Sequence, residues 1–254
     1  MSKIHFLHLG KTGGTALKEA LKENAPDVVK HPHKTKLYDI PTGDKVFFFI
    51  REPCSRFVSG FWSRQRSGRP RRDVPWSKGE RIAFDAYPTA NSLAESLYTN
   101  DHEQAVAAMR SIYHVRSSIY DWIISDKYLR SRCEDIILIG LQEQLDQDFQ
   151  HLKDLGVVSQ SASLPTDDIG MHRNPVDLDA SLSSRALENL RNWYKRDHRF
   201  YELVRSGRDQ GALVPDLSGL PEGGVTASLK DSARLLYARG RASMGRLKRS
   251  LRSS

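Results

Sequence analysis

Two short segments of the sequence combine residue types that bind anions. The first, Gly10-Lys11-Thr12-Gly13-Gly14-Thr15, follows a short apolar run and precedes a helical pattern that begins at Ala16. Glycines let the backbone turn tightly and point N–H groups at an anion, the helix N-terminus adds its dipole, and Lys11 adds a mobile cation. We predict that residues 10–16 bind a phosphate-like group, although glycine-rich turns also occur for purely structural reasons.

The second segment contains Arg51 and Ser59. Arg51 directly follows the apolar run Val46–Ile50, so we expect it at the carboxyl edge of a sheet, where open α/β folds bind ligands. Ser59 lies eight residues later, in the helix that Pro53 begins. A guanidinium and a hydroxyl held together there would bind a phosphate by charge-assisted hydrogen bonds. The alternative is an arginine that caps the sheet edge and a serine that faces solvent.

A nucleoside-triphosphate loop is the first alternative for residues 10–15. That pattern, Gly-x-x-x-x-Gly-Lys-Ser/Thr, would need its first glycine at position 5, which is His5. In addition, Arg51 stands where an acidic Mg²⁺ ligand would be expected, and a cation there repels a metal. A kinase or NTPase is therefore the weaker interpretation. A non-catalytic binding protein that acts through its basic tail is a further alternative.

The two segments together resemble the cofactor-binding elements of the sulfotransferases, which use 3′-phosphoadenosine-5′-phosphosulfate (PAPS). Residues 10–15 look like the 5′-phosphosulfate loop, and Arg51-Glu52-Pro53 with Arg56-Phe57-Val58-Ser59 looks like the 3′-phosphate element. The sequence is most similar to carbohydrate sulfotransferases related to heparan sulfate 2-O-sulfotransferase, over roughly residues 3–205. Weaker similarity includes Glu143-Gln144-Leu145 with Asp148, and Trp193-Tyr194 with Asp197 and Tyr201.

The resemblance implies a binding role for each segment. Lys11 and the loop amides would bind the 5′-phosphosulfate of PAPS, and Arg51 and Ser59 the 3′-phosphate. The product would be adenosine 3′,5′-bisphosphate. No metal is required for in-line transfer of the sulfuryl group to a hydroxyl acceptor, which we expect to be a carbohydrate, and no Cys/His cluster has the sequence spacing of metal ligands.

A transfer to an alcohol needs a group that accepts the hydroxyl proton, and histidine is the usual one near neutral pH. His31-Pro32-His33 lies between the two segments, and the 2-O-sulfotransferase group carries a similar His-x-His ahead of its 3′-phosphate strand. The resemblance therefore implies that His33 is the base, with His31 as its neighbour or substitute. Lys11 would stabilise the charge on the departing phosphate. A surface histidine pair, or a glutamate base at Glu19 or Glu23, is the alternative.

Three further histidines receive weaker interpretations. His5 and His8 lie in the first apolar run, and we expect them to be packed core residues. His172 matches a late loop that borders the cofactor in relatives.

The rest of the chain predicts the elements that position these residues. Strands are expected at Lys3–Leu9, Val46–Ile50 and Ile136–Ile139. Helices are expected at Ala16–Asn24, Pro53 to Arg66, Ser92–Leu97, Glu103–Ile112, around Leu145, Phe149 and Leu152, at Ser184–Tyr194 and at Asp197–Val204. Short buried strands that alternate with helices favour an α/β fold. We predict a P-loop-like, three-layer fold with a central, mainly parallel sheet flanked by helices.

Charge and composition divide the chain into a body and an appendage. The net charge is +8, but residues 225–254 hold eight basic residues and one acidic residue, so residues 1–224 are close to neutral. We predict a sulfotransferase domain at 1–205, a linker at 206–226 and a basic amphipathic tail at 227–254. The tail would lie on an anionic membrane surface or be disordered, and nucleic-acid binding is the least favoured option.

The remaining features bear on location and acceptor. Two cysteines, no signal peptide and no apolar run long enough to span a bilayer indicate a cytoplasmic protein, peripheral at a membrane if the tail binds one. The five arginines of residues 64–72 would rim the acceptor cleft and attract an anionic glycan, or belong to a solvated loop.

Overall fold

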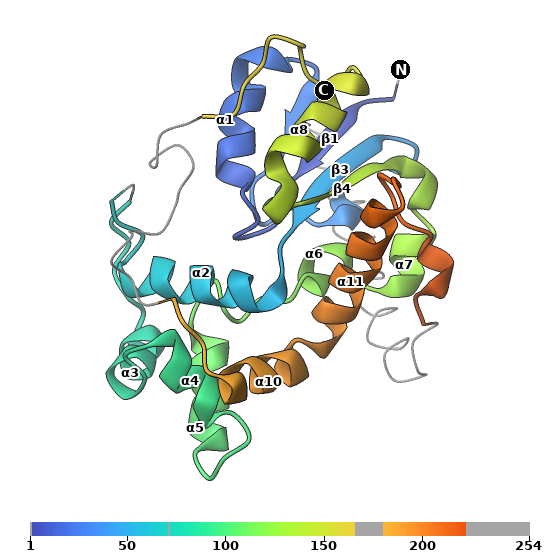
Figure 1. Ribbon diagram of the computed structural model, residues 1–254. Helices are drawn as coiled ribbons and strands as arrows, with labels where there is room; N and C mark the ends of the chain where they lie inside the picture. The colour runs from blue at the N-terminus through green and yellow to red at the C-terminus, as the bar shows by residue number, and fades with distance from the viewer. Residues whose placement is uncertain (1, 71, 166–179, 222–254) are drawn as a thin grey trace, which may run out of the picture.

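The computed structural model describes residues 2–70, 72–165 and 180–221. Its centre is a four-stranded sheet in the order β2-β1-β3-β4, and every neighbouring pair is parallel. The strands are β1 (Ile4–Leu7), β2 (Val28–Lys30), β3 (Lys45–Ile50) and β4 (Ile136–Leu141). The predicted α/β fold with a mainly parallel sheet is confirmed (Figure 1).

Helices cover both faces of the sheet, which explains why Val46–Ile50 of β3 are all apolar. Successive side chains of a strand point to opposite faces. Phe47 and Phe49 pack with α1 (Gly14–Asn24) and α8 (Leu145–Asp154). Phe48 and Ile50 pack on the other face, against α6 (Tyr120–Ile123), α7 (Asp126–Arg130) and α11 (Lys195–Asp209). The result is three layers.

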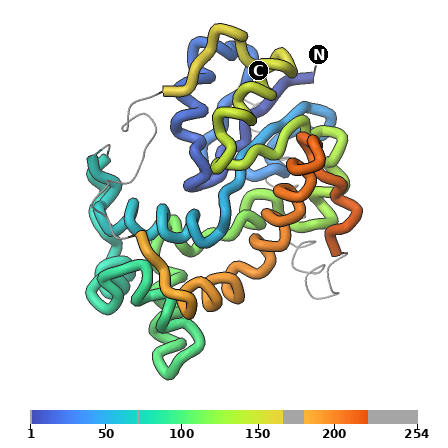
Figure 2. The backbone as a smooth tube through the Cα atoms, in the orientation of Figure 1, coloured from blue at the N-terminus to red at the C-terminus, as the bar shows by residue number. Residues whose placement is uncertain are grey.

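A helical unit with its own core lies beside the sheet. The chain leaves the end of β3, enters α2 (Pro53–Gln65) and returns through α10 into α11 (Figure 2). Three helices of this unit begin with an N-capping serine or threonine whose side chain accepts a hydrogen bond from the N–H of the third helical residue. The other helices of the unit are α3 (Lys78–Ala86), α4 (Ala90–Ser96), α5 (His102–Ser111) and α10 (Ser184–Trp193).

The structure differs from the prediction in several places, and three of these bear on the site and on the extent of the domain. The sequence gives no sign of β2, because three residues are too short for a periodic pattern. Helix α1 begins at Gly14 rather than Ala16. The predicted linker begins inside α11, which runs to Asp209, and Leu217 and Leu220 are buried in the core beside the sheet. The body therefore extends to at least residue 220, and the tail at 227–254 lies outside the described residues.

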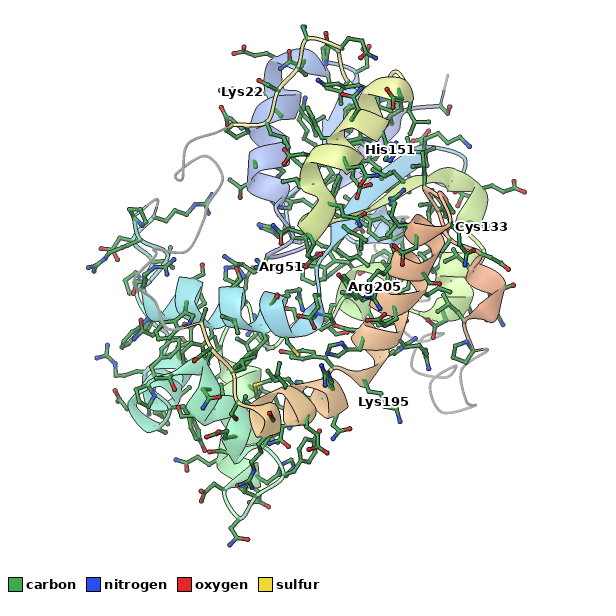
Figure 3. The ribbon with its side chains drawn as sticks, viewed as in Figure 1. Lys22, Arg51, Cys133, His151, Lys195 and Arg205 are labelled. Carbon is green, nitrogen blue, oxygen red and sulfur yellow. The ribbon has the colours of Figure 1, made fainter. Side chains whose placement is uncertain are left out.

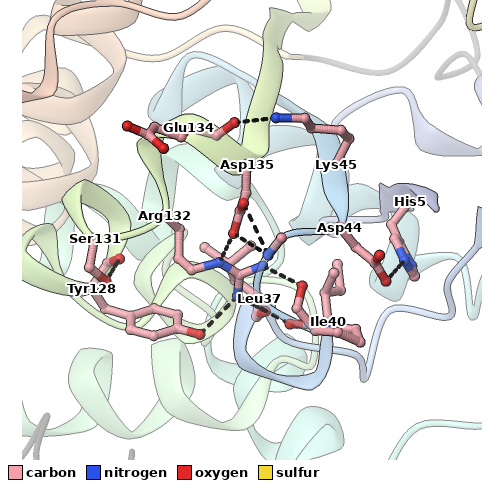
Figure 4. Close-up of polar contacts among 12 residues, drawn as sticks. His5, Leu37, Ile40, Asp44, Lys45, Tyr128, Ser131, Arg132, Glu134 and Asp135 are labelled. Carbon is pink, nitrogen blue, oxygen red and sulfur yellow. Dashed lines mark hydrogen bonds and ion pairs between the residues drawn. The ribbon is translucent and has the colours of Figure 1, made fainter. Parts of the chain in front are cut away.

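Arg132 fixes the connection between β2 and β3. Its guanidinium donates to the carbonyl oxygens of Leu37, Ile40 and Pro41 at 3.0–3.3 Å and pairs with Asp135 at 2.5 Å (Figure 4). The side chain is 2% exposed. Because this connection follows the predicted His31/His33 pair, the arginine holds one end of the segment that carries those histidines.

No helix in residues 2–70, 72–165 or 180–221 has both the length and the apolar character needed to cross a bilayer.

Candidate anion-binding site

The two predicted anion-binding segments lie at the same edge of the sheet. The loop at residues 10–15 follows β1, and Arg51 follows β3. These strands are adjacent and parallel, with Leu7 paired to Phe48, so their carboxyl ends meet at one edge. Figure 3 places Arg51 where the chain passes from the sheet to α2. The fold therefore brings together the segments that the sequence separates.

The loop is shaped to expose backbone N–H groups at the start of α1. Lys11 and Gly13 have positive φ angles of 67° and 75°, and the Thr12 hydroxyl donates to the carbonyl oxygen of Leu9 at 3.1 Å. Gly13 is the N-cap and has no side chain to cap the helix. The amides of the first turn, including Thr15 and Ala16, therefore keep their capacity to bind an anion.

The charges of two arginines act on Lys11 in this loop. Burial, together with the charges of Arg51 and then Arg66, lowers the pKa of Lys11 to about 7. Burial also lowers the pKa of Arg51, against the opposing effect of Glu143 and then Glu52. The Arg51 Nε is buried and has no hydrogen-bond partner among the described residues. Like charges held together, with a donor left unsatisfied, are expected of a site that binds an anion.

One face of α2 is directed at the loop, and Ser59 lies on it. Arg56 Nε donates to the Gly10 carbonyl oxygen at 3.1 Å, and the charge of Arg66 acts on Lys11. Ser59 is three residues after Arg56 and seven before Arg66, which is the spacing of one helix face. Its side chain is buried. Ser59 therefore lies on the same side of α2 as Arg56, which contacts the loop.

Arg56 ties the site to the rest of the protein. It is 2% exposed and also donates to the carbonyl oxygen of Ser117 at 2.6 Å. Asp197, in the first turn of α11, lies 4.0 Å from the guanidinium and accepts from the Ser118 hydroxyl and the Ile119 N–H. This network positions α2 against the loop.

His33 lies near the cations. Its ring centroid is 3.8 Å from that of His8, and Trp122 Nε1 donates to its carbonyl oxygen at 2.7 Å. Burial lowers its pKa against the opposing effect of a hydrogen bond with the backbone of His8, and the charges of Lys18, Lys11 and Arg72 lower it as well. The Nδ1 atom is buried without a partner among the described residues. His33 is therefore a neutral imidazole at pH 7, able to accept a proton.

His31 belongs to a different set of contacts. Its Nε2 is 2.9 Å from Nδ1 of His5, and Nε2 of His5 is 3.0 Å from Asp44; Figure 4 shows the contact between His5 and Asp44. His5 and His8 are both buried, as expected, and each lies against one histidine of the pair. The geometry thus separates the pair, with His33 beside the site and His31 in a chain of contacts that ends at Asp44.

His114 is a site residue that the sequence analysis did not identify. It precedes α6, and its backbone approaches α2 closely because Gly60 has no side chain: a Cβ there would lie 3.2 Å from the Cβ of His114. Burial lowers the pKa of His114 to about 2, and Lys11 and then His33 contribute. No motif surrounds residues 113–114, so only the fold reveals this proximity.

Other predicted residues lie elsewhere. Glu19 and Glu23 are exposed on α1. In the arginine-rich segment, Arg64 is buried and pairs with Glu80 at 2.6 Å, so it is structural, and Arg69 is exposed and paired with Asp73. His172 and Arg71 lie outside the described residues.

Comparison with known proteins does not add to this geometry. No protein-family model matches the chain, and no curated protein sequence matches it. The family resemblance of the two segments stays a prediction.

Proposed function

We propose that this protein is a sulfotransferase that moves the sulfuryl group of PAPS to a hydroxyl acceptor, and that this acceptor is a carbohydrate. The observation that carries the proposal is that Lys11 and Arg51 follow two adjacent parallel strands at one edge of the sheet, with the charges of Arg51 and of Arg66, at the end of α2, acting on Lys11. One bisphosphorylated nucleotide would satisfy both anion-binding segments. The partnerless Nε of Arg51 fits such a ligand.

Each residue has a distinct part in the proposed reaction. PAPS supplies the sulfuryl group together with a good leaving group. Lys11 and the amides of residues 12–16 bind the 5′ end and stabilise charge that develops there. Arg51 and Ser59 bind the 3′-phosphate. His33, neutral because burial lowers its pKa, accepts the acceptor's hydroxyl proton. As in phosphoryl transfer, positioning and electrostatics supply most of the rate.

Basic residues favour an acceptor that carries negative charge. The charges of Lys18 and Arg72 both act on His33, so the space near the proposed base has a positive potential. A sugar with carboxylate or sulfate groups would be attracted to it.

Calorimetric titration with adenosine 3′,5′-bisphosphate, with and without Mg²⁺, tests the donor site. We expect micromolar binding that does not depend on the metal. Arg51→Ala should weaken it roughly 10-fold to 100-fold, since a charge-assisted hydrogen bond contributes about 1.5–3 kcal/mol. Arg205→Ala is the matched control, because that arginine is exposed and pairs with Glu202. Magnesium-dependent binding, or equally strong binding of ATP, would support a kinase or NTPase instead.

Turnover tests the catalytic part of the proposal. Labelled PAPS and a panel of glycans should yield sulfated product, and His33→Ala and Lys11→Ala should abolish it. His31→Ala should retain more activity than His33→Ala, because His31 contacts His5 rather than the cations. A protein that binds the bisphosphate but transfers nothing to any acceptor would be a binding protein that kept the fold.

The basic tail at 227–254 is proposed to contact an anionic membrane from the cytoplasmic side, which would suit a lipid-linked saccharide acceptor. Its excess of positive charge supports this part. Flotation with phosphatidylglycerol vesicles, compared with phosphatidylcholine vesicles, tests it. Equal recovery with both vesicles would exclude an electrostatic membrane contact.

A further inference from the structure

Glu52, Cys54 and His198 form a cluster that the anion-binding site does not use. Glu52 precedes α2, Cys54 is its second residue, and His198 is in α11. One possible ligand atom from each lies within 4.8 Å of the other two, which is the sole group of three such residues among those the structure describes. The sequence could not reveal it, because 144 residues separate Cys54 from His198.

The separations suit a single ion bound by the three side chains. Sγ of Cys54 is 3.6 Å from Nε2 of His198, and Nδ1 of the same ring is 3.7 Å from a carboxylate oxygen of Glu52. Two ligands of tetrahedral Zn²⁺, at bond lengths of about 2.0–2.3 Å, lie roughly 3.5 Å apart. These two contacts use opposite nitrogens of the ring, so a single ion requires the side chains to rotate until Cys54 and Glu52 face the same nitrogen, and the three ligand atoms within 4.8 Å of one another leave only a short movement for this.

The surroundings allow an ion to reach these ligands. Cys54 is buried, but the side chains of His198 and Glu52 are 16% and 30% exposed. Glu52 accepts from the N–H groups of Cys54 and Ser55 at 3.0 and 2.6 Å, which caps α2. A carboxylate has about four lone-pair sites, so it can keep these bonds and also bind a cation.

A catalytic cysteine is the competing interpretation. The His198 imidazole lies between the Cys54 thiol and the Glu52 carboxylate, as in a nucleophile–histidine–acid triad. Burial raises the pKa of the Cys54 thiol to about 12, and the charge of Glu52 adds to that effect. A buried neutral thiol is a poor nucleophile. Binding of a divalent cation would have to release the thiol proton to solvent, and the cation would then stabilise the thiolate directly.

We propose that Glu52, Cys54 and His198 bind a thiophilic divalent cation of the Zn²⁺ type through three protein ligands and one open position. The soft thiolate ligand and the imidazole favour this class of metal, because Mg²⁺ and Ca²⁺ prefer sites made of oxygen ligands alone. None of the three side chains takes part in the proposed sulfuryl transfer, although Glu52 adjoins Arg51 and its charge acts on that residue. Arg191 opposes the cation, since its charge acts on both Cys54 and His198.

Titration of the metal-free full chain with Co²⁺ tests the proposal, because cobalt replaces zinc and gives a near-ultraviolet charge-transfer band when a thiolate binds it. We expect one equivalent to bind with that band. Cys54→Ser should remove the band, and His198→Gln should weaken binding at least about 10-fold. Cys133→Ser should leave both unchanged, because Cys133 is the other, exposed cysteine. Zn²⁺ should displace the cobalt.

Three results would overturn the proposal: no band in the unaltered chain, a band that survives Cys54→Ser, or a band lost in Cys133→Ser. Circular dichroism and thermal unfolding show whether each variant is folded. His198→Gln keeps the test decisive if the buried Cys54→Ser variant does not fold. Arg191→Gln, at an exposed position, should tighten cobalt binding, and weaker binding there would contradict the assigned charge effect.

Discussion

Lys11 has two features that are unfavourable in the protein without a ligand. Its backbone has a φ of 67°, a left-handed conformation that costs a non-glycine residue roughly 1–2 kcal/mol. Its ammonium is also held close to Arg51 and Arg66, and with burial this lowers its pKa to about 7. Strain of this kind persists where function requires it. Both features are consistent with a residue held in position for an anion.

The first prediction follows from the charge state of Lys11. Between its lowered pKa of about 7 and its ordinary value of 10.5, the free protein holds this lysine largely neutral. An anion beside it favours the charged form, so binding in that range should take up a proton. At pH 8.5 we expect uptake of nearly one proton per adenosine 3′,5′-bisphosphate, measured by calorimetry in buffers of different ionisation enthalpy. The phosphates are fully ionised at that pH, since their second pKa is about 6.

Lys11→Met provides the control, because it removes the titrating group while keeping a long side chain. If proton uptake persisted in this variant, the proton would belong to another group.

The pH dependence of stability gives a second test of the lowered Lys11 pKa. The unfolded chain, with an ordinary lysine pKa, binds more protons between pH 7 and 10.5, so the unliganded protein should become more stable as the pH rises through this range.

The histidines show how far residue-level prediction reaches. The sequence supplies His31 and His33 as a pair, and their order in the chain cannot separate them. Their different surroundings distinguish them: His31 contacts His5, and His33 contacts His8. Such contacts depend on the pairing of β1 with β2, and β2 is too short to be recognised. His114 has no neighbouring motif and is found only through the fold.

At the scale of elements, the loop and α1 are held by close packing beneath Gly14. A Cβ at this position would lie 2.1 Å from the ring of His8, which is itself buried. Gly14→Ala should therefore destabilise the protein, because overpacking costs about 1–3 kcal/mol. The higher helix propensity of alanine stabilises it by at most about 1 kcal/mol, which is too little to compensate. Displacement of the loop should also weaken binding of adenosine 3′,5′-bisphosphate. Urea unfolding and calorimetry measure the two effects.

Gly219→Ala is the matched control, because an added Cβ there meets no atom within 4 Å. It should change neither stability nor binding. If Gly14→Ala were as stable as the control and bound the ligand equally well, the loop would not depend on this packing, and its shape would need another cause.

Elements differ in how clearly the sequence announces them. The run Val46–Ile50 is apolar at every position, as expected of a strand covered on both faces, and it is found as part of β3. Pro53 marks the start of α2 correctly. The predicted start of α1, Ala16, is two residues late. Gly14 has a low helix propensity and is helical here only because of its place in the loop. Helix α11 runs on past the predicted end at Val204 to Asp209. Arg208 is fixed there by the carbonyl oxygen of Ile139 and the carboxylate of Asp148, two distant partners.

At the scale of the whole molecule, the sheet with its helices and the helical unit have separate hydrophobic cores. The sequence predicts the alternation of strands and helices but not the division into two cores. Helices α2 and α10 belong to the core of the helical unit, whereas β3 and α11, their neighbours in the chain, belong to the cores beside the sheet. Arg56 lies where the two meet. From α2 it reaches Gly10 of the loop, Ser117, and Asp197 of α11.

This arrangement predicts how the protein unfolds. Trp62, Trp76 and Trp193 belong to the helical unit, so tryptophan fluorescence reports mainly on that core, whereas far-ultraviolet circular dichroism reports on both. We expect the two signals to coincide in urea, because buried contacts of Arg56 couple the cores. Arg56→Met should lower the free energy of unfolding by about 3–5 kcal/mol, since it leaves Asp197 buried without its cation, and should separate the two transitions.

A double-mutant cycle with Asp197→Asn distinguishes this coupling from a simple loss of packing. Burial already raises the pKa of Asp197, and Arg56 is the largest opposing effect, so the carboxylate is costly once the arginine is gone. Adding Asp197→Asn to Arg56→Met should therefore recover part of the lost stability, and the two substitutions should not be additive. Arg205→Met, at an exposed ion pair, should leave the transitions coincident. Strict additivity, or coincident transitions in Arg56→Met, would mean that the cores are joined through their continuous helices rather than through this buried charge.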